Sequence, residues 1–190
     1  SLIKLVVRGE EMPGLANLHL TSRVNRLVRD LLRDADTTRW LSLAGLLRPL
    51  AEAAPNEFLS AVERSLARSD PPIAALFTVS GDGDYFERSY HVDLLWTLEL
   101  LAWSPSRFMR VVRILAQLSK LPLPERLGNR PSESLLGLFR TWLPQTAAPI
   151  GQRIEGLNWL VTAEPEVASR IADKLVYAGS DVGSHGARPH

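Results

Sequence analysis

The sequence predicts an all-α protein, built as an α-solenoid of antiparallel, HEAT- or armadillo-like helices, with an irregular helical bundle as the alternative. Apolar residues recur at the three- and four-residue spacing of a helix along most of the 190 residues. Prolines stand at the start of several of these runs, where the missing N–H costs nothing. A faint internal repeat is the third observation, and it favours the solenoid over the bundle.

The helical spacing is found in eight stretches. We expect helices over 22–34, 38–53, 55–67, 88–103, 105–121, 132–143, 150–162 and 165–177. Pro49 is expected to kink the second of these helices near its end. Strand signals are weak, because only residues 2–7 have β-like content and residues 72–79 are ambiguous.

The internal repeat is a layout in which one helix ends, a very short turn follows and a proline opens the next helix. It occurs at residues 50–55, 100–105 and 160–165, and the third copy is the weakest. So short a turn forces neighbouring helices to be antiparallel, and a unit that cannot bury its own face must stack on the next. The sequence therefore predicts a single helical-repeat domain over residues 1–179 and a flexible C-terminal tail over residues 180–190.

Composition excludes several classes of protein. The net charge is only +1, with 45% hydrophobic and 23% charged residues, which is typical of a folded domain and indicates no particular partner. There is no cysteine, so disulfides, thiolate metal sites and cysteine nucleophiles are excluded, and a reducing, cytoplasmic location is expected. No apolar run of about 18 residues is present, so we expect no membrane span. The start at Ser1 and the loop-like end suggest a segment of a larger protein.

Motifs for nucleotide binding and hydrolysis are missing. The sequence has no phosphate-binding G-x-x-x-x-G-K-[ST] loop, no G-x-S-x-G nucleophile elbow and no H-E-x-x-H zinc motif. Gly81 and Gly83 begin like a dinucleotide fingerprint, but no third glycine follows. The sequence therefore predicts no catalytic site and no cofactor.

An acidic loop gives one enzymatic alternative. Asp82, Asp84 and Glu87 could hold Ca²⁺ or Mg²⁺, and His91 beside Asp93 could act as a general base in a metal-assisted enzyme. The spacing matches no EF-hand, and a solvated Gly/Asp turn is favoured. His91 and Asp93 are two residues apart and do not face each other on a helix. We therefore expect His91 to be exposed at a helix start.

A basic ridge gives a second alternative. Arg107, Arg110, Arg113 and Lys120 follow one another with no acidic residue between Ser104 and Lys120. Such a stripe on a solenoid could bind the phosphate backbone of a nucleic acid. The polar side of an amphipathic helix is favoured as the explanation, with the arginines paired to acids such as Glu99 or Glu63.

The five tryptophans divide into two groups. Trp40, Trp96 and Trp142 lie among apolar-face positions and are expected in the core. Trp103 and Trp159 lie near helix ends and are expected to be half exposed. Exposed tryptophan beside arginine is typical of interface hot spots. Together with the ridge, these two tryptophans make up the candidate interaction surface: Arg107, Arg110, Arg113, Lys120, Trp103 and Trp159.

Two stretches carry a resemblance to a known group of proteins. One runs Leu94-Leu-Trp-Thr-Leu-Glu-Leu-Leu-Ala-Trp-Ser-Pro105 and continues through 107–116; the other is Asn129-Arg-Pro-Ser132 followed by Leu138-Phe-Arg-Thr-Trp-Leu-Pro-Gln-Thr146. Over residues 36–176 the chain resembles a helical region of very large bacterial proteins. Some of these carry signal-transducing ATPase or other effector modules, and some are suspected in phage defence. The resemblance implies a non-catalytic, sensor-type scaffold that binds a protein partner or the other domains of its parent.

Overall fold

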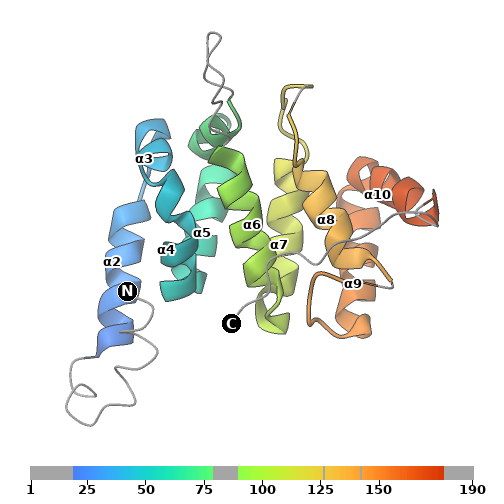
Figure 1. Ribbon diagram of the computed structural model, residues 1–190, viewed down its shortest axis with the longest axis horizontal. Coiled ribbons are helices and arrows are strands. Elements are labelled where there is room, and N and C mark those ends of the chain that lie inside the picture. The colour runs from blue at the N-terminus through green and yellow to red at the C-terminus, as the bar shows by residue number, and fades with distance from the viewer. Residues whose placement is uncertain (1–18, 79–89, 126, 142, 178–190) are drawn as a thin grey trace. The chain divides into compact units, whose positions relative to one another are not determined.

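The fold is all-α, as predicted. The computed structural model describes residues 19–78, 90–125, 127–141 and 143–177, and every regular element in these ranges is helical (Figure 1). The α-helices are α2 Leu20–Leu32, α3 Thr37–Ser42, α4 Leu47–Ala53, α5 Pro55–Leu66, α6 Tyr90–Ala102, α7 Pro105–Leu118, α8 Pro131–Phe139, α9 Ile150–Ala163 and α10 Pro165–Tyr177. Short 3₁₀ helices cover Ala44–Leu46 and Pro72–Phe77. The β-like residues 2–7 and the expected tail, 180–190, lie outside the described residues.

Proline marks the helix starts that the sequence indicated. Helices α5, α7, α8 and α10 each begin at a proline. Helix α10 matches its predicted bounds at both ends. Ser104 stands at the N-cap of α7 as expected, although its hydroxyl lies 2.9 Å from that of Ser106 and makes no capping bond.

One helix expected over residues 38–53 is instead broken. Helix α3 ends at Ser42, a 3₁₀ turn follows, and α4 starts at Leu47. Pro49 was expected to kink this helix near its end, and that prediction is wrong. It occupies the third position of α4, where a backbone N–H has no partner within the helix and its loss costs little.

The turns before two of the prolines have matching backbone geometry. Ala54 has φ −145° and ψ 69°, and Glu164 has φ −138° and ψ 59°. Each donates its backbone N–H to the carbonyl four residues earlier, Ala54 to Leu50 at 3.0 Å and Glu164 to Leu160 at 2.8 Å. The third copy, at residues 160–165, is the weakest in sequence, yet its turn has the same backbone conformation as that of the first copy.

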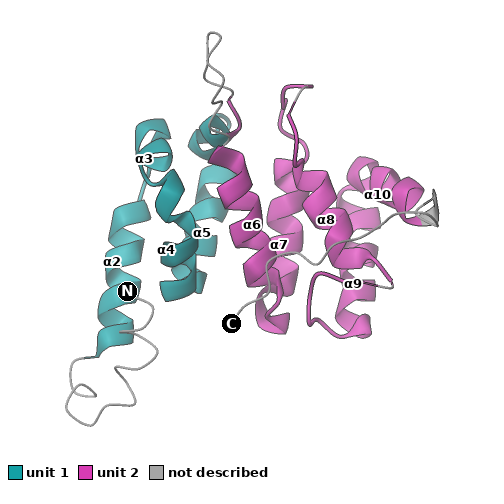
Figure 2. Ribbon diagram, viewed as in Figure 1, with its two compact units in different colours: residues 1–76 teal, residues 77–190 magenta. Residues whose placement is uncertain are grey.

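The chain divides into two compact units, residues 1–76 and 77–190 (Figure 2). In the first unit α2 and α4 pack against α5, and the fully buried side chains include Trp40, Leu47 and Phe58. Arg29 of α2 binds Glu57 of α5 through two hydrogen bonds of 2.7 and 2.9 Å. The expectation of one domain over residues 1–179 stays a prediction.

The second unit contains α6 to α10. Helix α6 packs on α7, α7 on α8 and α9, and α10 on both α8 and α9. Phe108 of α7 and Phe139 of α8 meet edge to face in its core, with ring centroids 5.9 Å apart. Helix α8 ends at Phe139, four residues before the predicted end, because Arg140 takes up an extended conformation.

Candidate interaction surface

The predicted surface residues lie on or beside α7 and α9, two helices that pack together. Arg107, Arg110 and Arg113 lie on α7, and Lys120 follows two residues after its end. Trp159 lies on α9, and Trp103 lies just before α7. Both tryptophans are half-buried, which agrees with the expected half exposure.

Arg113 and Lys120 both make contacts with α9 or its C-terminal end. The Arg113 guanidinium lies over the Trp159 ring, 5.5 Å from its centroid. Lys120 pairs with Glu164 at 2.9 Å. Contacts of these kinds at an exposed site are each worth about 0.5–1 kcal/mol or less. Both contacts join α7 to α9, so these two side chains are less available to a partner.

The other two basic residues are partly buried. Burial lowers the pKa of Arg107, and its Nε has no acceptor in the described part of the chain. Arg110 is half-buried. Glu99, which was suggested as a partner for these arginines, instead accepts a hydrogen bond from Ser134. The ridge is therefore not a continuous row of exposed cations, although binding of nucleic acid to it stays a prediction.

Helix α9 carries a stripe of exposed apolar side chains. Ile150, Ile154 and Val161 are 63%, 50% and 64% exposed, and Leu157 between them is half-buried. These positions follow the spacing i, i+4, i+7 and i+11, which places them on one face of the helix. We call this set the α9 stripe.

The stripe is not evident from the sequence, because Ile154, Leu157, Leu160 and Val161 all have the spacing of one apolar helix face. Only Leu160 among them is fully buried. One signal could have found the stripe. Arg153 and Glu155 are the only charged residues of α9, and its apolar residues spread over a wider arc than a single buried face requires.

The inner face of α9 is fixed by two unusual contacts. Arg153 is buried, and its guanidinium donates to the carbonyl oxygens of Leu138, Phe139 and Arg140 at 3.3, 3.0 and 2.6 Å. These carbonyls lie at the end of α8, where the helix dipole favours a cation. Gly156 faces the rings of Phe108 and Phe139, and an added Cβ would lie only 3.2–3.3 Å from them. These contacts turn one side of α9 toward the core, and the α9 stripe lies beside that packed side, roughly a quarter of a turn around the helix.

His91 is buried, and the expectation that it is exposed is wrong. Its Nε2 lies 2.9 Å from the carbonyl oxygen of Gly128, to which it donates a hydrogen bond, and its ring stacks on Phe77 at 5.4 Å. Residues from before and after α6 therefore cover a helix start that looked exposed in the sequence. Asp93 is exposed.

The metal-assisted alternative depends on Asp82 and Asp84, which lie outside the described residues, as does Glu87. Within the ranges that the structure describes, no three histidine or acidic side chains are grouped so as to hold a metal ion. The metal site around Asp82, Asp84 and His91 therefore stays a prediction.

The tryptophans expected in the core differ in how far they are buried. Trp40 is fully buried, as predicted. Trp96 is 55% exposed, so its assignment to the core is wrong. It lies on α6, where Leu94, Leu95 and Leu98 are buried instead and leave the tryptophan on the outer side. Trp142 lies outside the described residues.

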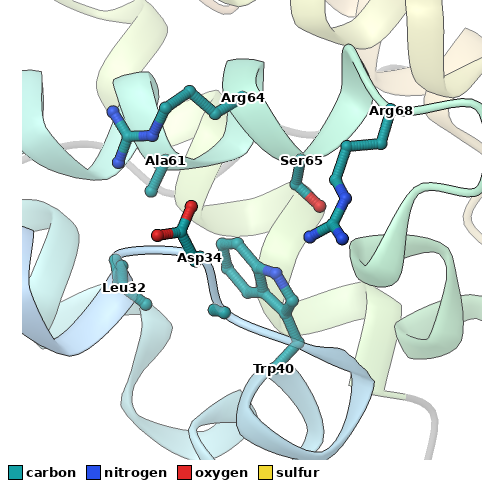
Figure 3. Close-up of a pocket in the computed structure, with 8 residues that line it drawn as sticks. Leu32, Asp34, Trp40, Ala61, Arg64, Ser65 and Arg68 are labelled. Atoms are coloured by element: carbon teal, nitrogen blue, oxygen red, sulfur yellow. The ribbon is translucent and has the colours of Figure 1, made fainter.

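The first unit contains a small cavity beside Trp40. It measures about 30 Å³ and is lined by Asp34, Arg64, Ser65 and Arg68 among others. The indole nitrogen faces the Ser65 and Arg68 side, and no described group accepts its hydrogen bond (Figure 3). Ligand pockets measure about 300–1,000 Å³, so this cavity has room for a water molecule but not for an organic cofactor.

A larger hollow of about 540 Å³ lies along α2. Its described wall is one face of a single helix, and includes Arg23, Arg26 and Leu27. Polar groups from two elements do not converge there, so the described wall gives no arrangement suited to chemistry on a bound substrate.

Glu99 of α6 is largely buried. Its Oε1 accepts a 2.7 Å hydrogen bond from the Ser134 hydroxyl of α8. Burial raises the pKa of Glu99 above its ordinary value, and the bond from Ser134 opposes part of that rise. The folded chain thus holds a proton at Glu99 at pH values where the unfolded chain has released it.

We expect Glu99 to make the protein less stable as the pH rises. Because the folded pKa is the higher one, the free energy of unfolding falls from the unfolded pKa up to the folded pKa and is flat above it. Glu99→Gln should remove this slope and raise stability at neutral pH, whereas Ser134→Ala should steepen the slope. Denaturant unfolding at a series of pH values checks this. A pH-independent difference between Glu99→Gln and the parent chain would contradict the interpretation.

No described helix has the length and apolar character needed to cross a bilayer. Comparison with protein-family models, with curated proteins and with solved structures finds no match to this chain. Any conclusion about function therefore depends on the surface itself.

Proposed function

We propose that the chain is a non-catalytic, HEAT- or armadillo-like helical-repeat segment of a larger bacterial protein. It acts in the cytoplasm as a scaffold or sensor-type module, and binds a protein partner or the other domains of its parent. The matching turns at Ala54 and Glu164 support a repeated unit, because the same backbone conformation precedes a proline-started helix in both places. Repeated helix pairs of this kind stack into solenoids with extended binding surfaces.

The observation that carries the proposal is the α9 stripe. Three of its side chains are at least half exposed, and they lie in line on one helix face instead of being scattered. Contiguous apolar side chains on a surface mark interaction sites, whereas single ones need no explanation. The inner face of α9 is already occupied through Arg153, Gly156 and Leu160, so the stripe is available for an additional contact.

Site-specific photo-crosslinking in cells that express the parent protein tests this function. A photoreactive residue in place of Ile154 should give crosslinks to a protein or to another domain of the parent. The same residue in place of Glu155, exposed on α9 and about 100° around the helix from Ile154, should give several-fold fewer. Equal yields at the two positions would overturn the assignment of α9 as a binding face.

The nucleic-acid alternative predicts a different result. Purified protein should then retard labelled DNA or RNA at low salt, with affinity falling steeply as salt increases. Charge reversal at Arg107 and Arg110 would abolish this binding, while Ile154→Asp would leave it unchanged. Absence of any retardation at low salt would rule out nucleic-acid binding by this chain.

A further inference from the structure

The α9 stripe has a spacing that is the same in both chain directions. Its members, Ile150, Ile154, Leu157 and Val161, are separated by four, three and four residues. Two such helices packed antiparallel would therefore place Ile150 opposite Val161 and Ile154 opposite Leu157. By symmetry, each of these pairs would occur twice in the interface. A two-fold symmetric interface requires this kind of self-complementary patch.

We infer that the α9 stripe binds a second copy of this chain through antiparallel α9–α9 packing. The inference rests on the proposed function of α9 as a docking face, and it names the partner. Each copy would cover the exposed isoleucine and valine side chains of the other, which removes apolar surface from water.

The residues beside the stripe favour a like partner over a charged one. Gly151, Asn158 and Thr162 are exposed and uncharged, and a Cβ added at Gly151 would meet nothing within 4 Å. Of the two charged residues of α9, Arg153 points inward and only Glu155 is exposed. An acidic or basic helix would find few complementary charges here, whereas a second α9 brings only its own Glu155, which lies roughly a third of a turn around the helix from the stripe.

The size of the stripe sets the strength of the association. Its four side chains extend over three helical turns, about 17 Å. A stable interface takes about 20–30 residues from each partner, so this contact belongs with the weak and transient ones. The dimer should form only at high protein concentration and should not require low salt.

Sedimentation velocity on the whole chain tests this inference. The weight-average sedimentation coefficient should rise with concentration, and the rise should persist in high salt because the contact is apolar. Ile154→Asp should abolish it, while Gln117→Glu, which adds the same charge at an exposed position of α7, should retain it. A monomer up to the solubility limit would overturn the inference, as would equal association by Ile154→Asp and the parent chain.

The absence of cysteine from the sequence allows a direct test of the antiparallel register. A mixture of Ile150→Cys and Val161→Cys chains should form a disulfide-linked dimer under mild oxidation, several-fold more than either chain alone. Equal or greater yields from the single chains would contradict antiparallel packing.

The two proposals fail in different ways. If the purified chain stays monomeric while Ile154 still crosslinks to another protein in cells, the second copy is wrong and the docking face stands. If Ile154 and Glu155 crosslink equally, the docking face itself is wrong.

Discussion

Replacing Arg153 by methionine is expected to lower the free energy of unfolding by about 3 kcal/mol. Three backbone carbonyls at the end of α8 accept hydrogen bonds from this one buried guanidinium. Methionine fills much of the same volume but donates nothing, so the carbonyls would remain buried without these donors. The loss is therefore one of hydrogen bonding and not of packing.

Arg153→Lys separates geometry from charge. An ammonium group is a compact point charge and lacks the planar fork that reaches several carbonyls at once, so lysine should restore only part of the stability. Arg113→Met is the control, because Arg113 is exposed and lies over Trp159; it should cost about 1 kcal/mol or less. Urea unfolding followed by circular dichroism measures all three. An Arg153→Met chain within about 0.5 kcal/mol of the parent would show that the carbonyls do not need the guanidinium.

Gly156→Leu is expected to destabilise the protein by a similar amount, about 3 kcal/mol. A Cβ at this position would already lie 3.2 Å from the Phe139 ring and 3.3 Å from Phe108, before the rest of the leucine is placed. Leucine is a better helix former than glycine by about 0.8 kcal/mol, but that gain is smaller than the cost of separating two packed rings. Helix α9 must then move away from α7 and α8.

The same substitution at Gly151 is the matched control. Gly151 lies on the same helix, and a Cβ there would meet nothing within 4 Å. Gly151→Leu should therefore be neutral or stabilising by up to about 1 kcal/mol, since only the helix preference changes. Thermal unfolding at low protein concentration compares the two variants. If both glycines responded alike, the close approach at Gly156 would not be what positions α9.

The features that sequence predicted well are local ones. A proline at a helix start needs only its own ring and missing N–H, so Pro55, Pro105, Pro131 and Pro165 were placed without knowledge of the fold. The α-helical class follows in the same way from residue spacing.

The wrong predictions concern contacts between distant residues. Gly128 and Phe77 bury His91, and neither is close to it in sequence. Trp96 shares a helix with so many leucines that periodicity could not decide which side faces out. On α9, Arg153 and Gly156 form the contacts that fix the inner face. Neither is a large apolar residue, so the apolar spacing of the sequence does not indicate them.

The turns at Ala54 and Glu164 show how much a helix–turn–proline connection can vary in sequence. Both conformations are set by a backbone hydrogen bond and by the proline that follows, so the side chain at the turn is not constrained. One turn carries alanine, and the other carries a glutamate that forms an ion pair with Lys120. The same turn geometry thus accommodates both alanine and glutamate, so this position can vary in side chain while the backbone conformation before the proline is kept.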